Sequence, residues 1–136
     1  AIDALQLRVD WRTRVATPDA RRAYGDEALA LVDRALVVQP TSALYGLRAR
    51  AATAAGRPEV IVESIASYAQ AMYATAARMP EGAQRSRART TLQGLAQVLE
   101  ETAAASPAVE PRAKEVRARV IDSLDRLQPA APAPRP

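Results

Sequence analysis

The sequence predicts an all-α protein made of antiparallel helical hairpins, and three observations support this fold class. Apolar residues recur at the spacing of one helical face through most of the chain. Short breaks that contain proline, glycine, serine or threonine divide the chain into six such segments. Alanine makes up 32 of the 136 residues. This suits thin helices that pack closely, because alanine has the highest helix propensity and lets backbones approach.

The length fits one domain, which we place at residues 1–128. A Pro/Ala-rich tail over 129–136 is expected to be disordered or polyproline-like. No segment shows the alternation of a half-buried strand. The six expected helices span residues 2–16, 18–38, 42–55, 58–78, 83–104 and 111–127.

Capping residues set the boundaries in the first half of the chain. Thr17 is expected to cap the helix over 18–38, with a proline at its first helical position and an aspartate in its first turn. Gly25 is a weak point inside this helix. Pro40 ends the helix, and Thr41 caps the next one.

Glycine and proline also mark the boundaries in the second half of the chain. Gly56 is suited to the left-handed position after a helix, and Pro58 opens the following helix. Breaks at 79–82 and 106–107 separate the last three helices. Their expected inward-facing residues are Ile61, Ile65, Tyr68 and Met72, then Ala88, Leu92, Leu95 and Leu99, then Val116, Val120, Leu124 and Leu127.

The composition argues against catalysis. Cysteine and histidine are both absent, which excludes Cys/His zinc sites and a nucleophile paired with histidine. The adjacent acids at 26–27 and at 100–101 point about 100° apart on a helix, so neither pair faces a common site. No glycine-rich phosphate loop occurs. We therefore expect no enzyme activity, no cofactor and no metal.

The basic residues have two interpretations. The formal net charge is +4, and 18 of the 19 basic residues are arginine. GC-rich coding enriches arginine together with alanine and proline, so we favour composition over selection for an anionic partner. Arg85, Arg87 and Arg89 are interpreted as a solvated face, because Arg85 and Arg87 point about 160° apart and Glu81 lies one turn before Arg85.

Two acid-first pairs in the last helix, Glu115 with Arg119 and Asp122 with Arg126, indicate ordinary surface charge. The alternative function left open by the arginines is a helical protein that binds nucleic acid or another anion.

A spaced set of small residues carries a resemblance to a known family. Ala28, Val32, Ala35 and Pro40 form the pattern A-x3-V-x2-A-x4-P. This is similar to A-x3-F-x2-A-x4-P, which ends the second helix of the tetratricopeptide repeat. The likeness extends over about 27–65. Tyr45 and Ala49 fall near the large and small positions of a following first helix, and Gly56 falls at its turn. Ile61 and Tyr68 are larger than the alanines that the family prefers. The alternative fold is a plain antiparallel helix bundle.

The resemblance implies a non-catalytic module that binds a protein or peptide segment in a groove lined by first helices. Carried onto this chain, the groove positions are Gly46, Arg50 and Thr53. Arg50 is the residue there that is able to bind a carboxylate through two hydrogen bonds. The alternative is that Arg50 is only solvated.

The same resemblance favours an accessory subunit of a bacterial envelope assembly, such as one for polysaccharide biosynthesis or export, or for secretion. No apolar run approaches the ~20 residues that span a bilayer. The chain begins with alanine rather than methionine, so we expect that an upstream signal or anchor was removed. This predicts a periplasmic or inner-membrane-attached location, with a cytoplasmic adaptor as the alternative. The apolar residues Ile2, Leu5 and Val9 would then contact the upstream segment or a partner.

Overall fold

The computed structural model describes residues 17–129, and this part of the chain is all-helical. It contains five α-helices and one 3-10 turn: α2 (Pro18–Val38), α3 (Ser42–Ala55), α4 (Pro58–Ala76), α5 (Ala83–Ala105), η1 (Pro107–Val109) and α6 (Glu110–Leu127). The all-α class is therefore confirmed. The helix expected over 2–16 and the tail after residue 129 lie outside the described residues.

The predicted caps are confirmed. Oγ1 of Thr17 accepts a hydrogen bond from the Ala20 N–H at 3.3 Å, and Oγ1 of Thr41 accepts one from the Leu44 N–H at 3.3 Å. Gly56 has φ 68°, the left-handed conformation that closes α3 and that glycine adopts without steric cost.

α4 ends earlier than predicted. Its last residue is Ala76, whereas the sequence indicated position 78. The N–H groups of Arg78 and Met79 donate to the carbonyls of Thr75 and Ala76, three residues back, so the chain tightens into turns here. The proline at position 80 accounts for this, because a proline disfavours helical geometry at the residue before it.

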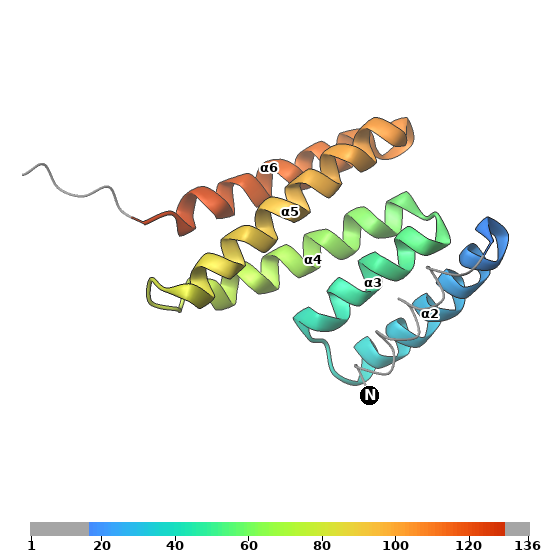
Figure 1. Ribbon diagram of the computed structural model, residues 1–136, viewed down its shortest axis with the longest axis horizontal. Coiled ribbons are helices and arrows are strands. Elements are labelled where there is room, and N and C mark those ends of the chain that lie inside the picture. The colour runs from blue at the N-terminus through green and yellow to red at the C-terminus, as the bar shows by residue number, and fades with distance from the viewer. Residues whose placement is uncertain (1–16, 130–136) are drawn as a thin grey trace, which may run out of the picture.

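Consecutive helices run antiparallel (Figure 1). α2, α3 and α4 lie side by side in that order, and the pair of α5 and α6 packs against α4. α3 packs against both α2 and α4, as the hairpin arrangement predicts, whereas α2 does not contact α4. α4 also packs against α5 and α6, and these two helices pair with each other. α4 is therefore the element through which α2 and α3 are joined to α5 and α6.

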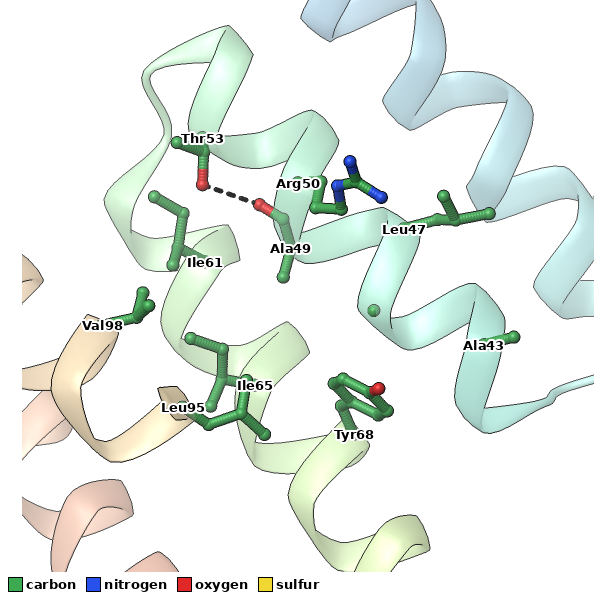
Figure 2. A pocket seen from close by; sticks show the side chains of 11 residues that line it. Ala43, Leu47, Ala49, Arg50, Thr53, Ile61, Ile65, Tyr68, Leu95 and Val98 are labelled. Carbon is green, nitrogen blue, oxygen red and sulfur yellow. Dashed lines mark hydrogen bonds between the residues drawn. The ribbon is translucent and has the colours of Figure 1, made fainter. Parts of the chain in front are cut away.

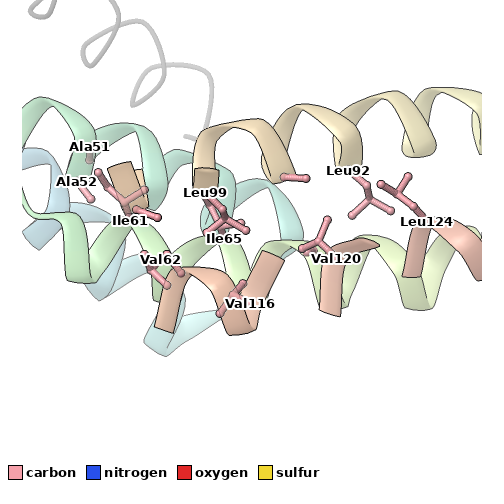
Figure 3. Packing of buried hydrophobic residues seen from close by; sticks show 14 of the residues in the cluster. Ala51, Ala52, Ile61, Val62, Ile65, Leu92, Leu99, Val116, Val120 and Leu124 are labelled. Atoms are coloured by element: carbon pink, nitrogen blue, oxygen red, sulfur yellow. The ribbon is translucent and has the colours of Figure 1, made fainter. Parts of the chain in front are cut away.

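The core lies mainly between α4, α5 and α6 (Figure 3). Its largest fully buried side chains include Ile65, Leu92, Leu99, Val116 and Val120. All four residues predicted to face inward from α6 are buried, whereas Ala88 and Leu95 of α5 and Tyr68 and Met72 of α4 are only half-buried. A smaller cluster of Val32, Leu44 and Leu47 joins α2 to α3.

Gly25 is not a weak point, and this corrects the interpretation from sequence. It is buried where α2 crosses the end of α3, and a Cβ atom at this position would overlap the backbone of Ala54 and Ala55. Glycine thus permits the two helix backbones to approach each other, and this contact outweighs its low helix propensity.

Substituting Gly25 by alanine should destabilise the fold. The added methyl group overlaps backbone atoms that cannot rotate away, an overpacking cost of about 1–3 kcal/mol, and the gain in helix propensity offsets about 1 kcal/mol of it. We expect the free energy of unfolding in urea to fall by up to about 2 kcal/mol.

Gly94→Ala is the matched control, since Gly94 lies within α5 with no atom within 4 Å of its added Cβ. It should raise stability by up to about 1 kcal/mol. Equal effects of the two substitutions would show that Gly25 has no packing role.

Candidate protein-binding groove

An apolar groove of about 430 Å³ lies between α3 and α5, with α4 as its floor (Figure 2). It exists because α4 packs against both helices while α3 and α5 do not contact each other. The floor consists of Ile61, Ile65 and Tyr68, which follow one face of α4 at intervals of four and three residues. The apolar spine predicted from sequence is therefore partly a groove floor as well as core.

Small residues make up much of the α3 wall. Ala43, Gly46 and Ala49 line the groove from α3 and leave room above the floor. A Cβ atom on Gly46 would lie 3.2 Å from Cε2 of Tyr68, closer than an ordinary van der Waals contact. The absence of a side chain at position 46 thus allows the Tyr68 ring to lie against α3.

The opposite wall comes from Leu95 and Val98 of α5. Val98 is one of three large apolar residues that are exposed within residues 17–129, at 37% of its surface. Sequence reasoning placed Leu95 on the core face and did not single out Val98. The signal was present, because Val98 follows Leu95 by three positions and so extends the same helical face.

The three groove residues predicted from sequence are brought together. Gly46, Arg50 and Thr53 lie on α3 and all line the groove. Oγ1 of Thr53 donates to the Ala49 carbonyl at 2.9 Å, and Arg50 is exposed. The role of Arg50 in binding a carboxylate stays a prediction. The other predicted contact residues, Ile2, Leu5 and Val9, lie outside the described residues.

Arg48, which sequence reasoning missed, connects α3 to both α2 and α4. Its Nε donates to Oδ1 of Asp33 on α2 at 2.7 Å, and its Nη1 donates to Oγ of Ser64 on α4 at 3.1 Å. Ser64 is fully buried, so this hydrogen bond satisfies a hydroxyl that would be costly to leave unpaired. The register of α3 between its neighbours is therefore fixed by a polar contact as well as by packing.

Arg85 and Arg89 do not form a solvated face, which corrects the interpretation from sequence. Their side chains are only 19% and 14% exposed. Nη1 of Arg89 donates to the Leu127 carbonyl at 2.9 Å, and Nη1 of Arg85 donates to the Met79 carbonyl at 3.0 Å. Arg89 also forms a bidentate pair with Glu81. The two arginines thus join the α4–α5 loop to the last turn of α6, where cations complement the carbonyl end of a helix.

Much of the positive charge of residues 17–129 is paired with carboxylates. The predicted pairs Glu115–Arg119 and Asp122–Arg126 are confirmed at 2.8 and 3.1 Å. Other basic residues that pair with an acid are Arg48, Arg57, Arg85, Arg89, Arg112, Lys114 and Arg117. Pairing of this kind reduces the charge available to a phosphate backbone.

One of these pairs connects α6 to α4 and changes the protonation of its acid. Nε and Nη2 of Arg112 donate to the two carboxylate oxygens of Glu63 at 2.7 and 2.9 Å. These hydrogen bonds lower the pKa of Glu63 and raise that of Arg112. Glu81 has a lowered pKa for the same reason, because Arg89 donates to it.

Residues 17–129 contain no group of acidic residues that could hold a metal ion. None of the helices described is long and apolar enough to cross a membrane. Compared with known proteins, the chain matches no protein-family model, no curated protein and no solved structure.

Arg89→Ala should loosen the end of α6. The substitution removes a hydrogen bond to the Leu127 carbonyl and the bidentate pair with Glu81. We expect a lower melting temperature and faster amide hydrogen exchange in the last turn of α6. Arg87→Ala is the control, because Arg87 is exposed and has no ion pair within the described residues. A loss of the same size in both variants would contradict the capping role.

Stability should decrease in acid partly through Glu63. A carboxyl whose pKa is lowered by folding stabilises the protein above its ordinary pKa of 4.5. It loses that contribution as the pH falls through the lowered value. The urea midpoint should therefore drop below about pH 4.5, and less steeply in Glu63→Gln. Glu59→Gln, at an exposed site on the same helix, should keep the steep drop. An unchanged slope in Glu63→Gln would show that the pair with Arg112 does not contribute.

Proposed function

We propose that this protein is a non-catalytic interaction module that binds a segment of a partner protein in the α3–α4–α5 groove. The observation that carries the proposal is an open groove whose lining is mostly apolar and comes from three helices. An inserted Leu, Ile or Phe side chain gains about 1.5–3 kcal/mol from burial. Val98 in particular offers apolar surface that a ligand would cover.

The edge of the groove adds a polar element to this proposal. Arg50 is the charged residue among those that line the groove, and no acid lines it. A guanidinium at an apolar groove favours a segment that carries a carboxylate beside its apolar residues. The segment class is therefore an apolar peptide with an acidic residue.

A tetratricopeptide-like hairpin array is the fold that we propose for this function. It is supported by the packing of α3 between α2 and α4, by burial of Ala28 and Val32 at the α2–α3 contact, and by the left-handed Gly56. α4, α5 and α6 contact one another mutually, which a helix bundle would also produce. Superposition of α2–α3 on α4–α5 distinguishes the hairpin array from the bundle. In a solenoid, the same rotation relates each helix pair to the next, whereas a bundle has no such recurring rotation.

The proposed setting is a bacterial envelope assembly in which this chain is an accessory subunit, periplasmic or attached to the inner membrane. The resemblance to tetratricopeptide domains is what supports this setting, and a cytoplasmic adaptor is the alternative. The full-length reading frame distinguishes them. An upstream signal or apolar run of ~20 residues favours the envelope, and an initiator Met directly before Ala1 favours the adaptor.

Val98→Asp should weaken segment binding. Peptides would be selected from a random library on the purified full chain, and their dissociation constants measured by fluorescence polarisation. A carboxylate in the groove wall opposes burial of apolar residues, so we expect affinity to fall about tenfold or more. Val37→Asp is the matched control, because Val37 is 86% exposed and lies away from the groove on α2.

Two outcomes would contradict the proposed function. Selected peptides that bind Val98→Asp as tightly as the unchanged chain would place the binding surface elsewhere. Binding of heparin or random DNA that persists at about 200 mM salt would favour the anion-binding alternative, since non-specific phosphate contacts weaken steeply with salt.

A further inference from the structure

A second pocket, of about 450 Å³, lies between α4 and α6. It shares no lining residue with the α3–α4–α5 groove. Its apolar lining consists of Ala66, Ala69, Val116 and Val120, of which Ala66 is half-buried and the other three are buried. The volume is within the range of sites that hold small molecules, which is about 300–1,000 Å³.

The uncharged polar residues of this pocket have spare hydrogen-bonding capacity. Ser67, Gln70 and Tyr73 line it from α4, and Ser123 lines it from α6. Within residues 17–129, none of these four side chains hydrogen-bonds to another group of the protein. Hydroxyl and amide groups both donate and accept, so they match a ligand that does the same.

Each charged residue of the pocket is already paired with an opposite charge, inside the pocket or beside it. Glu63 and Arg112 form the bidentate pair described above, and Arg119 pairs with Glu115. Asp122 pairs with Arg126. A charged ligand would compete with these pairs, whereas a neutral ligand leaves them in place.

We propose that this pocket binds a small neutral sugar of one or two rings. A sugar hydroxyl donates and accepts in the same way as the side chains of Ser67, Gln70 and Ser123. The C–H face of a sugar ring is apolar enough to lie against the half-buried Ala66, and the half-buried Tyr73 ring adds an aromatic surface with a hydroxyl. An apolar ligand would leave these hydroxyl and amide groups without water or partners, which is costly.

The test is an NMR titration of the full ¹⁵N-labelled chain with glucose, N-acetylglucosamine and maltose. We expect at least one sugar to shift the amide signals of the α4–α6 pocket, with a dissociation constant on the order of a millimolar. Gln70→Ala and Tyr73→Phe should each weaken this binding about threefold to tenfold, because each removes one hydrogen-bonding group. Tyr73→Phe keeps the ring and so preserves its packing against the core.

Two matched variants control for general effects of the substitutions. Gln93→Ala changes an exposed glutamine on α5, and Tyr45→Phe changes a half-buried tyrosine of α3 that lines neither site. Both should bind the sugar as the unchanged chain does. The proposal is overturned if none of the three sugars shifts the pocket signals, or if the control variants weaken binding as much as the pocket variants. Peptide binding in the groove is measured separately, so either site can fail without the other.

Discussion

The packing of α4 is the constraint on which the rest of the structure depends. α4 contacts α3, α5 and α6, whereas α2 reaches the other helices only through α3. A helix with three neighbours must bury a wide face, and accordingly the buried residues of α4 span an arc of about 160° from Ser64 through Ile61 and Ile65 to Val62. The apolar groove and the polar pocket both border α4, so a shift of this helix would change both sites together.

The chain compensates for its few large apolar residues in two ways. Small residues allow close contact between backbones, most clearly where Gly25 meets the end of α3. Arginine side chains then connect helices that are distant in sequence. Individual exposed ion pairs contribute little, but Arg48 also satisfies the buried hydroxyl of Ser64, and Arg89 satisfies a helix-terminal carbonyl. These arginines position helices in addition to adding charge, which weakens the inference from net charge to an anionic partner.

The two candidate sites differ in polarity because α4 presents different side chains on its two sides. On the side of α3 and α5, α4 presents Ile61, Ile65 and Tyr68, and the neighbouring helices add small and apolar residues. On the side of α6, it presents Ser67, Gln70 and Tyr73 above a layer of alanine and valine. One helix thus borders a surface suited to apolar segments and another suited to hydroxyl-rich molecules, and the two need not compete for their ligands.

The sequence by itself determined the local features of this protein. Helix boundaries, the Thr17 and Thr41 caps, the left-handed Gly56 and the apolar face of α6 all depend on residues within a few positions of one another, and capping and periodicity report such short-range physics. Tertiary structure decided the features that depend on contacts between residues distant in the sequence. Gly25 is a contact point because α3 crosses it, and Arg89 is mostly covered because it reaches the Leu127 carbonyl, 38 positions away in sequence. Val98 became a groove wall only because α3 and α5 pack on the same helix without contacting each other.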